Sequence, residues 1–261
     1  MKLLLLAVLA ACGRLDFNDT EGGSSIGDSG IAAKTTCGAK ATAPASITIA
    51  GDVFQYTDFT NDRSYIANGT VDVIDGTTTL ATATSAMDGS YTTSISTGGV
   101  ARSLILRATV NGMWPTETYS NGPIDRDLSQ VFNSVWRYGE ITVWGDGAMG
   151  SIYSALDSMI SIDPARSTIN VTAANCDGSA LEGVTFTLDP PAEGGMYYLN
   201  NGGVPSGGTV TTGIYTDMIA SNIPLGPMTI TAEAPGLAFA PITVDVQGPL
   251  HNLIVLMQPL E

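Results

Sequence analysis

Short runs in which apolar and polar residues alternate recur along most of the chain, separated by Gly, Asn, Asp and Pro. Alternation with a period of two turns one side chain toward a core and the next toward solvent, which predicts half-buried β-strands. Nine such runs span residues 46–50, 70–73, 90–95, 104–110, 168–172, 184–188, 228–232, 242–246 and 253–256. Strands of this length at intervals of about ten residues are typical of a β-sandwich or a barrel.

Between the two groups of strands the apolar residues change their spacing. Positions i, i+3, i+4, i+7 and i+8, which form one face of an α-helix, are occupied by Leu128, Val131, Phe132, Val135 and Trp136. A second apolar stripe, which ends at Asp163-Pro164, consists of Ile152, Leu156, Met159 and Ile160. These patterns predict a helical connector that packs on one or both β units.

The expected fold class is therefore mainly β, with two small antiparallel β-sandwich domains joined by a short helical connector. A signal peptide and a flexible tether precede them. The predicted segments are a signal peptide at 1–11, a lipid-anchored tether at 12–43, a first sandwich at 44–122, the connector at 123–165 and a second sandwich at 166–261.

The first twelve residues have the pattern of an export signal. Lys2 precedes an almost wholly apolar run, residues 3–9, which is shorter than the roughly 20 residues that a membrane-spanning helix needs. The sequence Leu9-Ala10-Ala11-Cys12 resembles the lipobox of bacterial lipoproteins, in which the cysteine thiol is acylated and the preceding peptide bond is cut. The resemblance implies lipidation at Cys12. Because Gly13 follows instead of Asp, it also implies sorting to the bacterial outer membrane, on the periplasmic face or the cell surface.

Charge restricts the partners of the protein. The chain has 25 acidic and 10 basic residues and a formal net charge of -15, which excludes nucleic acid and electrostatic docking on anionic lipid. Removal of residues 1–11 takes away Lys2 and leaves 9 basic and 25 acidic side chains, a net charge of -16. Residues 13–43 show no hydrophobic periodicity, so we expect a flexible tether that holds the folded part away from the lipid.

Two cysteines remain after Cys12 is assigned to lipid. Cys37 and Cys176 are an even pair in an exported chain, where oxidation is permitted. They form either one disulfide or two separate thiols, since spacing alone does not show that two side chains meet. The single histidine, His251, and the lack of paired cysteine motifs offer almost no ligands for zinc or another transition metal. We therefore expect no metal site and no cofactor.

Four Asp-Gly pairs are candidates for calcium binding, because calcium prefers carboxylate and carbonyl oxygens. They are Asp75-Gly76, Asp88-Gly89, Asp146-Gly147 and Asp177-Gly178. None has the twelve-residue spacing of an EF-hand loop, and Asp-Gly is also common in hairpin turns. The pattern favours turns over calcium sites.

The second half of the chain resembles a carboxypeptidase regulatory-like, or transthyretin-like, domain. Residues 169–186 contain a strand, an Asp-Gly turn, and Gly183 ahead of the next strand, as in that family. Residues 222–236 match its Pro-x-Gly turn, the strand that follows and the closing glycine.

A fainter copy lies in the first half, where residues 88–92 and 106–114 resemble strands of the same family. Residues 54–68 have no counterpart in the pattern. The resemblance covers most of 46–120 and 166–257. It implies Ig-like β-sandwich modules that are accessory domains without catalytic residues of their own. Together with the lipobox, these modules look like surface lipoproteins of environmental Gram-negative bacteria.

These observations favour a non-enzymatic, lipid-anchored envelope protein that presents β-sandwich modules for binding or scaffolding. Its expected partners are the membrane, through the lipid, and an envelope protein or a polysaccharide. An alternative is a glycan-binding module, whose stacking and hydrogen-bonding groups would be Trp114, Trp136, Trp144, Tyr197, Tyr198, Asn200, Asn201 and Asp217. A two-carboxylate hydrolase is a weaker alternative, because the acidic residues form no recognisable pair.

Overall fold

Every regular element in the described part of the chain is a β-strand. The computed structural model describes residues 34–56, 63–128, 140–143, 163, 165–199, 205–213 and 216–261. Its strands are Ser46–Tyr56 (β1), Arg63–Tyr65 (β2), Thr70–Asp75 (β3), Thr78–Thr84 (β4), Ser90–Ser96 (β5), Leu104–Thr109 (β6), Thr116–Ser120 (β7), Ile141–Thr142 (β8), Ser167–Ala173 (β9), Thr185–Asp189 (β10), Met196–Leu199 (β11), Pro205–Ser206 (β12), Asp217–Ile223 (β13), Gly226–Glu233 (β14), Ile242–Val246 (β15) and Asn252–Met257 (β16).

The nine strands predicted from alternation are all present, with ends that move by a few residues. The mainly β fold class is thereby confirmed. Seven further strands were not predicted: β2, β4, β7, β8, β11, β12 and β13. Most of them are short or rich in hydroxyl and charged residues, so their sequences show little apolar alternation.

The helical connector predicted for residues 123–165 is not supported by the described part of that stretch. Ile124 forms an antiparallel bridge with Arg102, and β8 pairs in parallel with β1. Ile141 and Val143 are fully buried beside β1, which explains why this piece forms a strand. The remainder of the two helical patterns, from 129 to 139 and from 144 to 162, lies outside the described residues.

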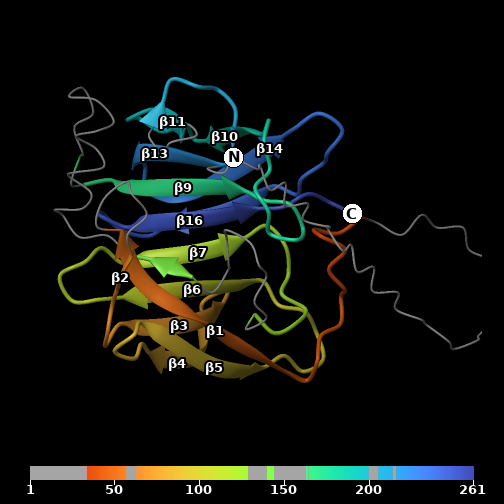
Figure 1. Ribbon diagram of the computed structural model, residues 1–261, viewed down its shortest axis with the longest axis vertical. Coiled ribbons are helices and arrows are strands. Elements are labelled where there is room, and N and C mark those ends of the chain that lie inside the picture. The colour runs from red at the N-terminus through yellow and green to blue at the C-terminus, as the bar shows by residue number, and fades with distance from the viewer. Residues whose placement is uncertain are drawn as a thin grey trace, which may run out of the picture. The chain divides into compact units, whose positions relative to one another are not determined.

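The strands form one large sheet and two small ones. The large sheet has nine strands in the order β12-β11-β13-β9-β16-β7-β6-β3-β4, and Figure 1 shows most of them side by side. A four-stranded sheet has the order β2-β1-β5, with β8 paired to β1. A three-stranded sheet has the order β10-β14-β15.

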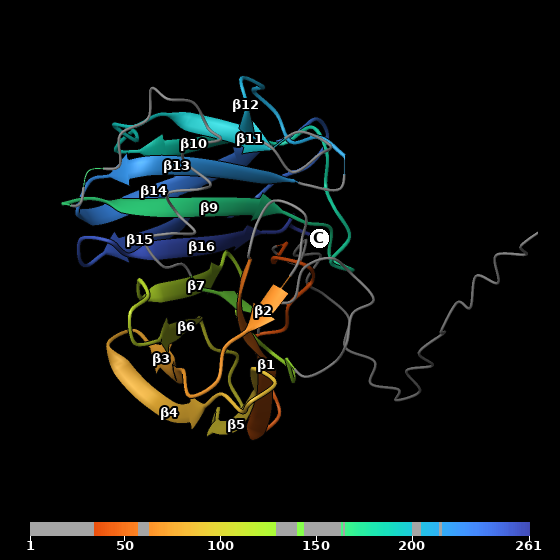
Figure 2. The ribbon, with the colours of Figure 1, turned by 60° about the vertical axis from the view of Figure 1, so that its left-hand side comes forward.

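Each small sheet shares a hydrophobic core with a different end of the large sheet. The N-terminal core joins β1, β5 and β8 to β3 and β6, and its members include Ile47, Ile49, Val71, Val73, Leu104 and Leu106. The C-terminal core joins β10, β14 and β15 to β9, β13 and β16, and its members include Ile169, Val171, Met218, Ile230, Val244 and Leu253. Figure 2 shows β10, β14 and β15 at the end of the molecule that holds β9, β13 and β16.

The two cores lie on opposite faces of the large sheet. On β6, Leu106 points into the N-terminal core, whereas the neighbouring Ile105 packs against the C-terminal core. Tyr119 on β7 also belongs to the C-terminal core. Since side chains alternate between the faces of a strand, β6 serves both cores at once, and β7 adds Tyr119 to the C-terminal one.

The centre of the large sheet is parallel. β16 pairs in parallel with both β7 and β9, whereas most other strand pairs are antiparallel. Residues 253–255 are buried, without a polar residue between them, and such unbroken apolar runs are typical of parallel strands that are covered on both faces. The predicted antiparallel sandwiches are therefore fused: a continuous sheet joins them, and Lys34–Glu261 form one compact unit.

We expect the two cores to unfold in one transition, because they share the large sheet. Leu106→Ala in the N-terminal core and Ile230→Ala in the C-terminal core should each cost about 2–5 kcal/mol, because both side chains are fully buried. In calorimetry and circular dichroism each variant should lower the same single transition, while the exposed Thr187→Ala should change stability by less than about 0.5 kcal/mol. Two resolved transitions, with each substitution moving only one of them, would contradict the shared sheet.

Candidate functional site

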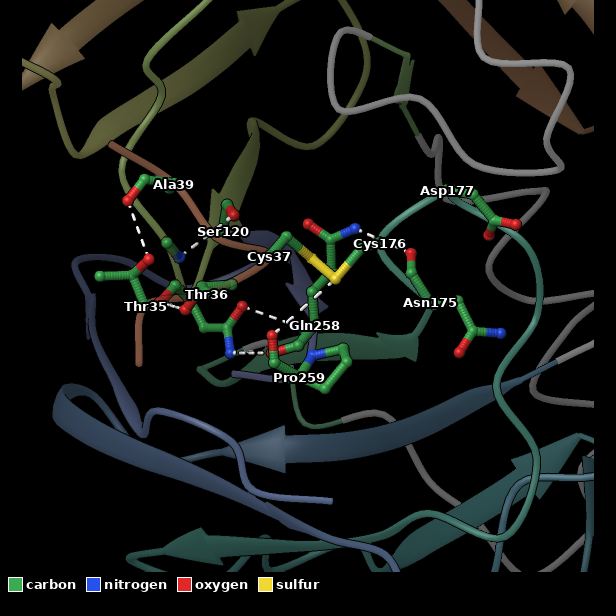
Figure 3. The surroundings of a disulfide bond; sticks show 12 residues. Thr35, Thr36, Cys37, Ala39, Ser120, Asn175, Cys176, Asp177, Gln258 and Pro259 are labelled. Carbon is green, nitrogen blue, oxygen red and sulfur yellow. Dashed lines mark hydrogen bonds between the residues drawn. A yellow bond between two sulfur atoms is a disulfide. The ribbon is translucent and has the colours of Figure 1, made fainter. Parts of the chain in front are cut away.

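The carboxyl ends of the three central parallel strands meet at one edge of the large sheet. β7 ends at Ser120, β9 at Ala173 and β16 at Met257, and the chain segments that follow them come together there. The first described residues of the chain cross this edge as well (Figure 3). We call the resulting cluster the seam, and its members are Thr35–Ala39, Asn121, Asn175, Cys176 and Gln258–Glu261.

In the seam, the N-terminal segment pairs with the C-terminal one. Thr36 and Leu260 form an antiparallel bridge. The backbone N–H of Thr35 donates to the carbonyl of Glu261 at 3.2 Å, and the N–H of Glu261 donates back at 3.0 Å. The N–H of Cys37 donates to the carbonyl of Pro259 at 2.9 Å. This pairing places residues 35–37, at the start of the folded unit, directly beside residues 259–261.

A disulfide joins the N-terminal segment to the loop after β9. Cys37 and Cys176 are bonded, with their Cα atoms 5.1 Å apart and 139 positions apart in the sequence (Figure 3). Cys37 has a φ of 48° in a turn closed by bonds from Gly38 to Thr35 and from Ala39 to Thr36. Of the two alternatives that the sequence left open, the structure contains the bonded pair.

Two amide side chains complete the seam. The side-chain amide of Asn121 donates to the backbone carbonyl of Gln258 at 2.9 Å and accepts from the backbone N–H of Gln258 at 3.0 Å. One side chain thus satisfies both backbone hydrogen-bonding groups of Gln258. Gln258 in turn donates to the carbonyl of Asn175 at 3.0 Å. These contacts tie together the ends of all three parallel strands.

Close packing also holds the N-terminal segment in place. A Cβ on Gly122 would lie 2.6 Å from the Cβ of Thr36, so only glycine leaves room for the crossing chain. The hydroxyl of Thr36 donates to the carbonyl of Asn121 at 3.0 Å. Farther along, the N–H of Lys40 donates to the carboxylate of Asp125 at 2.9 Å.

The predicted tether ends earlier than its proposed boundary at residue 43. Residues 34–43 lie against the fold through the seam and through the bridge between Thr42 and Val100. Their polar composition hid this, because the contacts are made by backbone groups, by the side chain of Thr36 and by one cysteine, and not by an apolar stripe. The lipidation residue, Cys12, lies outside the described residues.

Of the side chains proposed for a glycan site, the structure describes four, and three of these are buried. Trp114, Tyr198 and Asp217 are buried, and the Tyr198 hydroxyl accepts a hydrogen bond from the backbone of Phe186 at 2.7 Å inside the C-terminal core. Tyr197 is half-buried. The remaining members of the set, Trp136, Trp144, Asn200 and Asn201, lie outside the described residues.

Three of the four Asp-Gly pairs form turns. Gly76, Gly89 and Gly178 have φ values of 60°, 79° and 79°, which favour glycine. The carboxylates of Asp88 and Asp177 accept hydrogen bonds from the hydroxyl and the N–H of Ser90 and Ser179, respectively, and these bonds lower the pKa of both acids. The fourth pair, Asp146-Gly147, lies outside the described residues.

One buried acid on β7 forms an ion pair with an arginine on β6. Glu117 on β7 is fully buried and accepts from Arg107 at 2.6 Å and from the hydroxyl of Tyr119. Arg107 also donates to Gln247 at 3.1 Å. Burial lowers the pKa of the nearby His251, the Glu117 carboxylate raises it in part, and Arg107 lowers it further. One oxygen of Glu117 therefore joins β7 to β6, the other binds Tyr119 on the same strand, and Arg107 links β6 to the β15–β16 loop.

A second buried acid has no cation beside it among the residues whose contacts are described. Asp217 on β13 is fully buried, accepts from the Thr172 hydroxyl, and receives a further hydrogen bond from Asn170. Burial raises the pKa of Asp217 to about 7, although both hydrogen bonds lower it. Register places Asp217 and Glu117 on opposite faces of the large sheet, so they do not form the facing pair that a carboxylate hydrolase needs.

In the ranges that the structure describes, no group of three His, Cys, Asp or Glu side chains converges as metal ligands would. Within the same ranges, no helix has the length and hydropathy that a bilayer crossing requires.

Sequence reasoning identified the two cysteines but missed Asn121, Gln258, Gly122 and Glu117. An Asn-Gly pair at 121–122 indicates a turn, yet it does not reveal a side chain that bonds to residue 258. Glu117 stands in the run Thr-Glu-Thr-Tyr-Ser, which has no aliphatic residue to mark it as a buried strand.

Comparisons with known proteins assign no family. No protein-family model matches the chain, and no curated protein matches it. Among solved structures, it is similar to the TIE protein of Bacillus anthracis at a TM-score of 0.26 and 9% identity, over 82% of this chain and 35% of that one.

Two pilins give similar values. The minor pilin GBS52 of Streptococcus agalactiae has a TM-score of 0.26 and 12% identity, over 83% of this chain and 95% of that one. The shaft pilin spaA of Lactobacillus rhamnosus GG has a TM-score of 0.24 and 10% identity, over 84% and 98%. The chain spans about a third of the TIE protein. At these TM-scores the likeness carries no argument about function.

Loss of the disulfide should destabilise the fold strongly. In the chain-entropy account, a bond that closes a loop of about 140 residues contributes roughly 4–5 kcal/mol. The double variant Cys37→Ser, Cys176→Ser should therefore unfold at a much lower urea concentration than the oxidised protein. Reductant should bring the unmodified protein to the same midpoint and leave the double variant unchanged. An unmodified protein whose midpoint ignores reductant would contradict the bond.

Asp217 should make stability depend on pH. Its pKa is raised in the folded state, so the folded protein keeps a proton that the unfolded chain has lost above about pH 4. Stability from this group is therefore complete below about pH 4 and declines until the pH passes 7, by about 1.4 kcal/mol per pH unit. Asp217→Asn should remove this decline, so the difference in unfolding free energy between variant and wild type should grow by about 2–3 kcal/mol from pH 5 to pH 7. A difference that stays constant over that range would show that Asp217 titrates normally.

Proposed function

We propose that this chain is a non-enzymatic envelope protein, held to the bacterial outer membrane by an acylated Cys12, that presents a fused pair of β-sandwiches for binding or scaffolding. The observation that carries the proposal is the seam. It fixes the chain covalently at Cys37, within the segment 12–43 that the sequence predicts as a tether, and thus gives an anchor a firm attachment to the folded unit.

The charge of the chain fits a tethered module. The net charge of -16 that remains after removal of residues 1–11 repels anionic headgroups, so a lipid on Cys12 would hold the protein while the folded unit stays away from the surface. Two or three acyl chains on one cysteine bind far more firmly than one, at about 0.8 kcal/mol per buried methylene. A flexible segment between Cys12 and the seam would let the folded unit reach partners at a distance from the lipid.

The resemblance to carboxypeptidase regulatory-like domains remains part of the proposal. In the second half, β9, the Asp177-Gly178 turn and β10 follow the order that the resemblance implies. In the first half, β5 and β6 are the strands that carry the fainter copy. We propose the domain limits 44–122 and 166–261 for the two modules, which share the large sheet.

A scaffolding role also agrees with the state of the buried acids. The Glu117 carboxylate accepts hydrogen bonds from Arg107 and Tyr119, and the buried Asp217 carboxyl group accepts hydrogen bonds from Thr172 and Asn170. These groups stabilise the packing between strands, and a general acid or base would need an oxygen that faces substrate.

The anchor is tested by metabolic labelling in a Gram-negative host. Wild-type protein should incorporate labelled palmitate and fractionate with the outer membrane, because the thiol of Cys12 carries the acyl group. Cys12→Ala should lose the label and leave the membrane fraction. Cys37→Ala is the matched control, since it removes a cysteine from the seam, and it should keep the label. Equal labelling of wild type and Cys12→Ala, or a wild type that is not retained by membranes, would refute lipidation.

A further inference from the structure

We propose that the Cys37–Cys176 disulfide is the joint through which tension on the N-terminal tether enters the fold, and that it keeps this tension off the backbone of the first sandwich. The inference rests on the proposed function, because it assumes that the protein is held by its N-terminal end. It concerns how the folded unit withstands a pull between that anchor and a partner.

The hydrogen bonds of the seam are arranged so that a pull opens them in sequence. Thr35 pairs with Glu261 and Cys37 with Pro259, in antiparallel order. In such a pair the outer ends of both segments lie on the same side, so tension between the chain ends loads one bond at a time. These hydrogen bonds therefore break one after another, and the tension then acts on Cys37.

Beyond Cys37 the shortest covalent route leads across the sulfur atoms. The bond connects directly to Cys176, 139 positions later, in the loop that follows β9. Strands β1 to β9 all lie between the two cysteines, and with them the whole N-terminal core. Tension between the tether and any point after Cys176 thus passes without stretching the backbone of residues 38–175.

The surroundings of the disulfide support this role. Asn121 and Gln258 bind the ends of β7, β16 and β9 to each other, and Gln258 lies beside the disulfide, so the force reaches a sheet edge held by hydrogen bonds (Figure 3). Close contact between Thr36 and Gly122 keeps the entering segment against that edge. The N-terminal core would then remain a folded platform while the second sandwich carries the pull.

Single-molecule force spectroscopy tests the route. The chain carrying Cys12→Ser is held by handles at its two ends, so the result does not depend on acylation and is separable from failure of the proposed anchor. Complete unfolding of the oxidised chain should release less length than unfolding in dithiothreitol. The deficit should be roughly 460–500 Å, because the 139 positions closed by the disulfide would each add about 3.3–3.6 Å.

Reduction under load gives a direct signature. With the oxidised chain extended at constant force, dithiothreitol should produce one further step of the same size. The exchange cleaves the sulfur–sulfur bond to two cysteine thiols and oxidises one dithiothreitol to its cyclic disulfide. The Cys37→Ser, Cys176→Ser variant should release the full length without reductant and show no step. Equal lengths for the oxidised and reduced chains, or a step in the double variant, would overturn the proposal.

Discussion

The parallel pairing of β16 with β7 and β9 is the constraint on which the rest of the structure depends. Without it, the strands of the N-terminal half and those of the C-terminal half would form separate sheets with separate cores. With it, β7 and β9 end at the same edge although 46 residues of chain separate Ser120 from Ser167. That shared edge is where the seam forms, so the attachment point is a direct product of strand direction.

Local pattern was sufficient to find strands whose two faces have different surroundings. Residues 46–50 and 242–246 alternate because one face meets a small core and the other meets solvent, and both were predicted. β13 was missed because both of its faces are buried and a bulge between Ala220 and Ile223 breaks its period. β7 was missed because its interior places are taken by Thr, Glu and Tyr, which a hydrophobic pattern does not detect.

The association of the two halves was beyond reach of the sequence for a different reason. Which strands become neighbours depends on contacts between residues far apart in the chain, such as the register of Leu253 against Glu117 and Ile169. No pattern within a short stretch of sequence indicates which distant strands will pair. The same holds for the seam: Cys37 and Cys176 could be named as partners, but Asn121 and Gln258 acquire a role only once three strand ends converge.

The continuous sheet has a consequence for any attempt to take the protein apart. Division of the chain between its halves would leave β7 and β16 each with a bare row of backbone N–H and C=O groups, along strands that are otherwise covered. Such rows recruit a strand from another molecule, and the nearest suitable one is the missing half of a second copy. Isolated halves should accordingly exchange strands or aggregate. The two sandwiches together are therefore the smallest part of this chain that we expect to remain monomeric.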